Sequence, residues 1–313
     1  MEMVDPIDLS GFKTVSLYER KSKVELETFS RPPFKGMTFR EFMDSLPDIL
    51  GARDLKAFSK AVVEARRNGR PFMVGMGAHL IKVGLNPVII HLMEQGIITS
   101  ISQNGACIIH DFELAASGRT SEDVQTALGD GSFGNARETG EFLNECAKEA
   151  KRDGIGFGEA VGRAIFKGDF PYKDYSIAYN CYKLKIPLTV HVAIGTDIVH
   201  IHPSASGEAI GAATFTDFRR FCTLVSRLEG GVYANIGSAV LMPEVFLKAL
   251  TLVRNLGYKV ERIVTANFDF IRQYRPLTNV VQRPTSCGGA GYSFTGHHEI
   301  MIPLFAAMLI EQL

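Results

Sequence analysis

The sequence predicts an α/β fold: a doubly wound, mostly parallel sheet with helices on both faces. Short apolar runs of strand length alternate along the chain with longer stretches that carry helix start signals. Hydrophobic residues make up 46% of the 313 residues, which is enough for a large core. Strands that are apolar throughout are typical of parallel sheets, because such sheets are covered on both faces.

The first half of the chain establishes this alternation. Thr38 and Glu41 have the spacing of a capping box, which predicts that a helix begins there. The apolar run over residues 72–76 predicts the first strand. A second strand is expected over residues 97–102. Further helices are expected over residues 54–67, 87–95 and 106–114. Another helix should begin after a cap at residues 120–123, and two more should lie between residues 137 and 167.

The second half repeats the pattern. Pro243 suits the first residue of a helix, where its missing N–H would have no partner. The expected strands are 187–193, 232–236 and 262–266, and the expected helices are 173–184, 208–228, 243–256 and 300–312. This organisation predicts an N-terminal arm over residues 1–35, lying on the domain or on a neighbouring subunit, and a single α/β domain over 36–313.

The charge balance and the cysteines restrict the partners and the compartment. The chain has 34 basic and 34 acidic residues, so no excess positive charge favours nucleic acid or an anionic membrane. Five scattered cysteines without a C-x-x-C pair argue against a disulfide framework. No apolar stretch reaches the roughly 20 residues that cross a bilayer. We therefore expect a cytoplasmic protein that acts on a small molecule.

Glycine-rich turns follow three of the expected strands. In open α/β sheets ligands bind beyond the carboxyl ends of the strands, and glycine lets the backbone approach a phosphate. The residues of these turns that a ligand could contact are Gly77, His79, Asn104, Gly105, Ala106, Gly237 and Ser238. A tight turn without a ligand is the alternative interpretation at each place.

Two groups of residues are candidates for catalysis. In the first, the Asp111 carboxylate could orient His110 as a general base, although the pair also fits an ordinary helix start. In the second, Asp197, His200 and His202 follow His191 closely. On a strand, His200 and His202 would face the same side. Acid–base or ligand-binding work, a metal site and simple packing all remain open for this cluster.

A thiol lies in a late glycine-rich segment. Cys287 is followed by two glycines and, further on, by His297 and His298. Near a histidine a cysteine can become a nucleophile if its pKa is lowered. A bystander cysteine in a flexible loop is the alternative.

Taken together, the ordered segments resemble the deoxyhypusine synthase family from about Phe72 to the C-terminus. The resemblance rests on residues 77–84, on the turn 102–106, on residues 176–187 with their Ile-Pro strand start, and on the following Gly195 and Asp197. It implies a Rossmann-like sheet that binds NAD as cofactor at the turns Gly77–His79, Gly105–Ala106 and Gly237–Ser238, with Asp197 lining the site. It also implies a homotetramer with active sites near subunit interfaces, and transfer of an aminobutyl group from spermidine through an enzyme lysine.

The sequence departs from this family where the chemistry is decided. By our alignment the imine-forming lysine is replaced by Gly289, and acidic residues that hold the polyamine are replaced by Gln282 and Arg283. Glycine cannot form an imine, so synthesis of deoxyhypusine is not expected. We expect a related NAD-dependent transferase or oxidoreductase with altered chemistry. The alternatives are a non-catalytic protein that binds a metabolite or partner, and a metal-dependent hydrolase using His191, His200 and His202.

Overall fold

The computed structural model describes residues 4–313 of the chain. The chain divides into two compact units, one that ends at Arg53 and one that runs from Asp54 to Leu313. No helix of the residues described here is long and apolar enough to cross a membrane.

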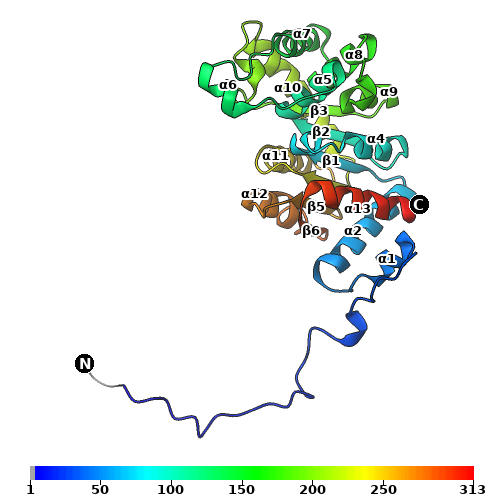
Figure 1. The fold of residues 1–313 in the computed structure, drawn as a ribbon, viewed down its shortest axis with the longest axis vertical. Coiled ribbons are helices and arrows are strands. Elements are labelled where there is room, and N and C mark those ends of the chain that lie inside the picture. Colours follow the sequence, from blue (N-terminus) through cyan, green and yellow to red (C-terminus); the bar gives the residue numbers. More distant parts are fainter. Residues whose placement is uncertain (1–3) are drawn as a thin grey trace. The chain divides into compact units, whose positions relative to one another are not determined.

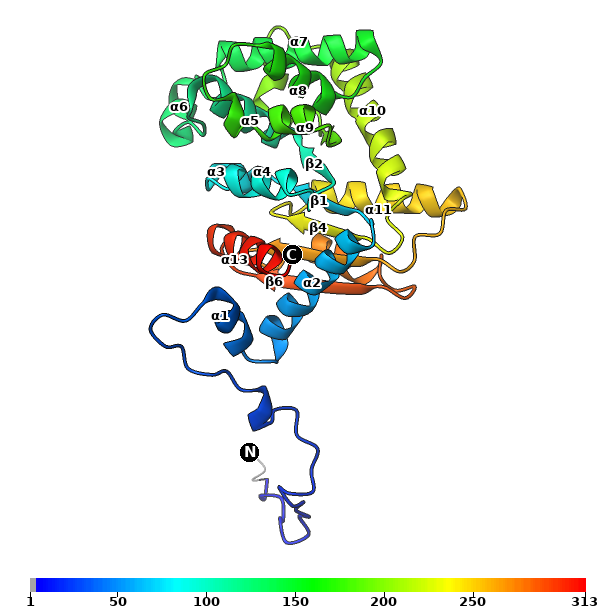
Figure 2. The same cartoon turned by 90° about the vertical axis from the view of Figure 1, so that its right-hand side faces the viewer.

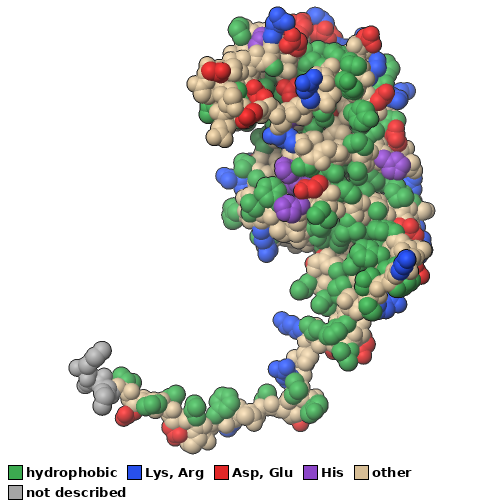
Figure 3. Space-filling model, in the orientation of Figure 1, with side chains coloured by type: hydrophobic (Ala, Val, Ile, Leu, Met, Phe, Trp, Pro, Cys, Tyr) green, Lys and Arg blue, Asp and Glu red, His purple; other side chains and the backbone are tan. Residues whose placement is uncertain are grey.

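The first unit contains little regular structure. It has the short 3-10 helix η1 (Leu26–Thr28) and the helix α1 (Phe39–Ser45). The predicted capping box is confirmed, since Thr38 Oγ1 accepts from the N–H of Glu41 and the Glu41 carboxylate accepts from the N–H of Thr38. Large apolar side chains along this unit are exposed, as Figure 3 shows; they include Val4, Ile7, Leu9, Phe12, Val15, Leu17, Tyr18, Val24, Leu26, Phe29 and Phe34.

The second unit is built on a six-stranded sheet with the order β3-β2-β1-β4-β5-β6, and every neighbouring pair is parallel (Figure 1). This confirms the predicted α/β class. The strands are β1 (Phe72–Met76), β2 (Ser100–Asn104), β3 (Leu188–His191), β4 (Val232–Ile236), β5 (Val264–Asp269) and β6 (Ala290–Thr295). The order reverses between β1 and β4, which makes their carboxyl ends the topological switch point of the sheet.

Helices connect the strands and cover both faces of the sheet (Figures 1 and 2). The α-helices are α2 (Leu50–Arg67), α3 (His79–Lys82), α4 (Asn86–Glu94), α5 (Gly105–Ser117), α6 (Val124–Asp130), α7 (Arg137–Asp153), α8 (Phe157–Lys167), α9 (Ile177–Leu184), α10 (Gly207–Val225), α11 (Leu241–Asn255), α12 (Tyr274–Pro276) and α13 (His298–Glu311). Short turns of other helix types are η2 (Lys173–Tyr175), η3 (Ile198–His200) and the π-helix η4 (Leu277–Gln282).

Aromatic side chains fill the core on each face of the sheet. On one face, Phe58 of α2 stacks on Phe305 of α13 at 5.2 Å and contacts Phe72, Phe268 and Phe294 of the strands. On the other, Tyr233 of β4 stacks on Phe246 of α11 with ring centroids 3.9 Å apart. These contacts hold the sheet between two layers of helices.

Some sequence-based boundaries were wrong. Ala290 and Gly291, at the end of the glycine-rich segment around Cys287, begin the edge strand β6, which was not predicted. The helix expected over residues 173–184 is divided, with the turn η2 before α9. Pro243 is the third residue of α11 rather than the first, since the helix begins at Leu241. The strand β6 depends on pairing with β5, and the start of α9 on the carboxylate of Asp111, and local sequence does not display either contact.

Candidate active site at the carboxyl edge of the sheet

The turns after β1 and β4 touch each other at the switch point. The N–H of Gly77 donates to the carbonyl of Ile236 at 3.0 Å. A Cβ added to Gly77 would lie 2.1 Å from the carbonyl oxygen of Gly237, and Gly237 itself has a φ of +66°. Both positions therefore require glycine: one for a backbone contact and the other for its left-handed conformation. Two of the predicted cofactor-binding residues are brought together here.

A cluster of aromatic rings lies beside these glycines. The ring of His79 is 5.1 Å from that of His298 and 5.3 Å from that of Phe270, measured between centroids. A Cβ on Gly237 would lie 3.1 Å from the ring of His298. The cluster thus joins the segments that follow β1, β4, β5 and β6 at one edge.

His298 is a buried residue with one unpaired nitrogen. Its Nε2 lies 3.1 Å from the carbonyl oxygen of Phe268, which can only accept, so Nε2 carries the hydrogen in the neutral ring. Nδ1 has no hydrogen-bond partner among the described residues. Burial lowers the pKa of His298, which favours this neutral form with a free acceptor. Sequence reasoning noted His298 only as a neighbour of Cys287.

Ser238 and Asn104, both predicted cofactor contacts, serve as helix caps. The hydroxyl of Ser238 accepts from the N–H of Met242 at 3.2 Å, in the first turn of α11. The side-chain oxygen of Asn104 accepts from the N–H of Cys107 at 3.1 Å, at the start of α5. Both side chains therefore stabilise the strand-to-helix turn that carries them.

Asp197 lies against the first residue of α5. A Cβ on Gly105 would lie 1.9 Å from Asp197 Oδ2, so the carboxylate occupies the space where a side chain would be. His200 holds Asp197 from the other side. Its Nδ1 accepts from the N–H of Gly195 at 3.1 Å and of Asp197 at 3.2 Å, and its Nε2 is 3.9 Å from Asp197 Oδ2. Burial raises the pKa of Asp197, and its interactions with His200 and Thr196 oppose that shift.

A small cavity brings Asp197 and His110 together. Its volume is about 140 Å³, and its lining includes Lys82, Ala106, His110, Glu113 and Asp197. Nδ1 of His110 is 2.6 Å from the hydroxyl of Thr120 and 3.7 Å from Glu113 Oε2. Burial raises the pKa of Glu113, but hydrogen bonds from His110 and Thr120 outweigh it, so the pKa is lowered overall. Glu113 and Lys82 were not among the predicted site residues.

The predicted pairing of Asp111 with His110 is wrong. Asp111 is fully buried and accepts from the Ser176 hydroxyl at 2.6 Å and from the N–H groups of Ile177 at 2.7 Å and Ala178 at 2.9 Å. Adjacent residues on a helix point in different directions, so Asp111 caps α9 while His110 faces Glu113. Burial raises the pKa of Asp111 to about 6, although these hydrogen bonds oppose the shift.

The three histidines proposed for a metal centre do not share a site. His191 is buried and bonds Thr189 at 3.0 Å, and burial lowers its pKa to about 3. His200 lies in the turn η3 rather than on a strand, so it does not face the same side as His202. His202 bonds the hydroxyl of Ser204 at 2.7 Å and packs over Gly140. Within residues 4–313 no three His, Cys, Asp or Glu side chains are placed to hold a metal ion.

The proposed association of Cys287 with histidines is also wrong. Cys287 is exposed in the turn that precedes β6, and His297 follows the other end of that strand. Six residues of extended chain span about 20 Å. Gly289 lies at the same amino edge as Cys287, where an added Cβ would be 2.2 Å from the carbonyl oxygen of Ile263. The position aligned with the family's lysine is therefore at the amino ends of the strands, whereas Gly77 and Asp197 lie at the carboxyl ends.

Comparison with known proteins adds information on the fold. No protein-family model matches the sequence, and no curated protein sequence does. Among solved structures, the complex of an AgrE mutant with L-arginine has a TM-score of 0.52 and 15% identity over 82% of this chain and 31% of that one. ArgZ, an arginine dihydrolase from the ornithine-ammonia cycle in cyanobacteria, has a TM-score of 0.50 and 14% identity over 85% and 33%.

A putative deoxyhypusine synthase from Entamoeba histolytica has a TM-score of 0.48 and 10% identity, over 88% of this chain and 94% of that one. The chain spans about a third of the length of the AgrE and ArgZ chains. At these identities the likeness to the AgrE and ArgZ chains is one of fold alone.

Proposed function

We propose that the carboxyl edge of the sheet binds a nucleotide of the NAD type. The observation that carries the proposal is the contact between Gly77 and Gly237 at the switch point. The two glycines pack backbone against backbone, so the turns that lead into α3 and α11 lie side by side, and in our proposal the pyrophosphate binds where these two turns meet. The predicted site residues Gly77, His79, Gly237 and Ser238 belong to these turns.

The helix that follows β4 fits a phosphate better than the helix that follows β2. At the start of the 15-residue helix α11 the N-cap Val240 provides no side-chain hydrogen bond, and the N–H of Met242 is bound by the neutral hydroxyl of Ser238. The start of α5 is capped by Asn104 and faces the carboxylate of Asp197. A helix N-terminus attracts negative charge, and a carboxylate already placed there repels a phosphate. The free acceptor on His298 fits a donor such as a ribose hydroxyl.

Asp197 and His110 are the acid–base groups of the proposed reaction. An NAD-type cofactor supplies hydride transfer when it is bound. In our proposal Asp197, positioned by His200, or His110, positioned by Glu113, removes the proton from a hydroxyl or amine of a small substrate. The predicted oxidation uses no enzyme imine, in keeping with glycine at position 289. The chain would be a deoxyhypusine-synthase-like enzyme with altered chemistry.

We further propose that the chain self-associates, as the family resemblance implies for a homotetramer. The support is the row of exposed apolar side chains between Val4 and Phe34, because a monomer rarely exposes so many. Light scattering of the full chain tests this: a single monomeric species at micromolar concentration would contradict it.

The nucleotide proposal is tested by identifying what the purified protein carries. The protein is denatured, any released nucleotide is identified by mass spectrometry, and NAD is titrated while the melting temperature is followed. A ligand that binds only the folded state raises the melting temperature with its concentration. The His79→Ala variant should keep its melting temperature without NAD and lose most of the NAD-dependent increase. His91→Ala, an exposed histidine on α4, is the matched control.

The outcomes separate the proposed function from its rival. Stabilisation by NAD that His79→Ala reduces and His91→Ala preserves supports the nucleotide site. If NAD neither co-purifies nor stabilises, the site assignment fails, and a non-catalytic protein that binds another metabolite or a partner protein becomes the better interpretation.

A further inference from the structure

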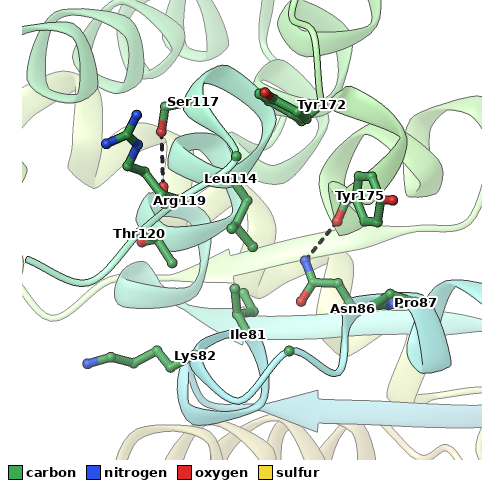
Figure 4. Close-up of a pocket in the computed structure, with 12 residues that line it drawn as sticks. Ile81, Lys82, Asn86, Pro87, Leu114, Ser117, Arg119, Thr120, Tyr172 and Tyr175 are labelled. Carbon is green, nitrogen blue, oxygen red and sulfur yellow. Dashed lines mark hydrogen bonds between the residues drawn. The ribbon is translucent and has the colours of Figure 1, made fainter.

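A larger cavity lies between α3, α4 and the end of α5, and no sequence-based prediction involved it. Its volume is about 630 Å³, within the range of small-molecule sites. Figure 4 shows its walls, which come from the turn after α3, the start of α4, the turn after α5 and the tyrosines before α9. The lining residues are Ile81, Lys82, Gly84, Asn86, Pro87, Leu114, Ser117, Gly118, Arg119, Thr120, Tyr172 and Tyr175.

The charge of this cavity has one sign. Lys82 and Arg119 line it, and none of the lining residues that the structure describes is a carboxylate. In Figure 4 both cations lie on the left, Arg119 above and Lys82 below. The hydroxyls of Ser117 and Thr120 beside Arg119 donate to the carbonyl of Arg119 and to the carboxylate of Glu113. A phosphate monoester carries a charge of about −1.5 to −2 at neutral pH, which two cations balance, whereas a carboxylate needs only one. This end of the cavity therefore fits a phosphate.

The opposite side of the cavity is aromatic and held in place. Tyr172 and Tyr175 are partly exposed, at 44% and 57%. The ring of Tyr172 lies over Gly118, where an added Cβ would be 3.0 Å away, and its N–H donates to the carbonyl of Ala115 at 3.1 Å. The carbonyl of Tyr175 accepts from the side-chain amide of Asn86 at 2.8 Å. The backbones of both tyrosines are held by hydrogen bonds, and their rings offer a surface against which a flat ring can pack.

Asn86 leaves one hydrogen-bond acceptor unused in this cavity. Asn86 is only 3% exposed, and its Nδ2 donates to Tyr175 and to Asp111 Oδ1 at 3.2 Å. These acceptors fix the orientation of the amide, and Oδ1 has no partner among the described residues. In Figure 4 this oxygen points away from Tyr175, toward the side of Ile81 and Leu114. A buried unpaired carbonyl is costly, so a ligand N–H that reaches it would be favoured.

We propose that this cavity is a second binding site, separate from the switch point, for a phosphate monoester with an aromatic ring that carries an N–H donor. The phosphate lies at Lys82 and Arg119, and the ring packs against Tyr172 and Tyr175. An N–H group attached to the ring, such as the amino group of adenine, donates to Oδ1 of Asn86. A nucleoside monophosphate has this chemistry and this size. The site does not depend on the function proposed above.

The test is calorimetric titration of the full chain with three probes that divide the proposed ligand into parts. AMP has both the ring and the phosphate, adenosine has the ring alone, and inorganic phosphate has the anion alone. AMP should bind more tightly than either part. Arg119→Ala and Tyr172→Ala should each weaken AMP binding by about tenfold or more, since each removes a charged or stacking contact. Tyr258→Ala, a tyrosine that is 53% exposed and outside the cavity, is the control.

His79→Ala distinguishes this site from the one at the switch point. If AMP binds in the proposed cavity, His79→Ala leaves its affinity unchanged, whether or not NAD binds elsewhere. AMP affinity that falls in His79→Ala but not in Arg119→Ala would place AMP at the switch point and overturn the proposal. No AMP binding at millimolar concentration by a chain with a normal circular dichroism spectrum and melting curve would overturn it as well.

Discussion

The carboxylate of Asp197 lies against Gly105, the residue at which α5 begins. The two residues are far apart in the sequence, and the η3 turn and the end of β2 bring them together. A helix N-terminus stabilises a negative charge. Burial raises the pKa of Asp197. The two influences oppose each other, and burial prevails, so the pKa of Asp197 lies above its ordinary value.

Gly105→Ala should displace this carboxylate. Its Cβ would lie 1.9 Å from Asp197 Oδ2, so the η3 turn must move. Overpacking of this kind costs roughly 1–3 kcal/mol of unfolding free energy. Gly211→Ala is the control, since that helical glycine in α10 has nothing within 4 Å of an added Cβ and should be neutral or stabilised. Urea unfolding of both variants measures the difference; equal stability would contradict the placement of Asp197.

Asp111→Ala should be among the most damaging single substitutions. It leaves the Ser176 hydroxyl and the N–H groups of Ile177 and Ala178 buried without an acceptor. We expect a loss of about 3 kcal/mol in unfolding free energy. Asp123→Ala removes the cap of the exposed helix α6 and should cost clearly less. If the Asp123 variant lost as much stability as the Asp111 variant in denaturant titrations, burial would not be the deciding factor.

Asp217 should make the protein less stable as the pH rises from about 4 to about 7. Burial raises its pKa to about 7, although N–H groups of Gly158 and Val190, both at 2.9 Å, and Arg220 oppose the shift. Between about pH 4 and pH 7 the folded state keeps a proton on Asp217 that the unfolded state has released. The free energy of unfolding therefore falls as the pH rises through this range. Relative to Asp217→Asn, the natural chain should lose roughly 2–3 kcal/mol between pH 5 and 8.

This comparison isolates Asp217 from groups with the opposite effect. The lowered pKa of His191, about 3, gives stability that increases from about pH 3 to pH 6.5, and it is common to both chains. Unfolding curves of the two proteins at several pH values give the difference directly. A difference that is constant with pH would show that Asp217 has an ordinary pKa.

Cys287 should be the one thiol that reacts in the native protein. It is exposed, whereas Cys107, Cys146, Cys181 and Cys222 are buried. Burial raises the pKa of each of these four thiols, which disfavours the reactive thiolate. A colorimetric thiol reagent should modify one cysteine rapidly in buffer and all five in denaturant. Cys287→Ser should abolish the rapid phase; its persistence would mean that another thiol is accessible.

Gly289→Lys should not restore imine chemistry. Its Cβ would lie 2.2 Å from the carbonyl of Ile263, and the residue is at the amino edge of the sheet, away from Gly77. We expect a loss of roughly 1–3 kcal/mol in stability and no adduct with spermidine after borohydride reduction. Gly129→Lys, on α6 with nothing within 4 Å of an added Cβ, is the control for stability. A trapped adduct specific to the Gly289 variant would contradict this placement.

The sequence predicted best the elements that are buried along their whole length. Residues 72–76 and 232–236 are strands with the predicted bounds, because both are central in a parallel sheet and buried on both faces. The strand β6 was missed because it is an edge strand that starts Ala290-Gly291 and is only partly buried, so it lacks the continuous apolar run. A pattern-based prediction detects burial rather than hydrogen bonding.

The site depended on contacts that no local pattern contains. The sequence by itself determined the α/β class and the glycine turns at Gly77 and Gly237. Short strands that are apolar throughout fit a parallel sheet buried on both faces, and the glycines that follow them fit tight turns. Only the tertiary structure decided that Asp111 caps α9 while Glu113 faces His110, and that Gly289 and Asp197 lie at opposite edges. The physical reason is that a carboxylate takes its role from the donors and charges around it, and here those come from segments distant in the chain.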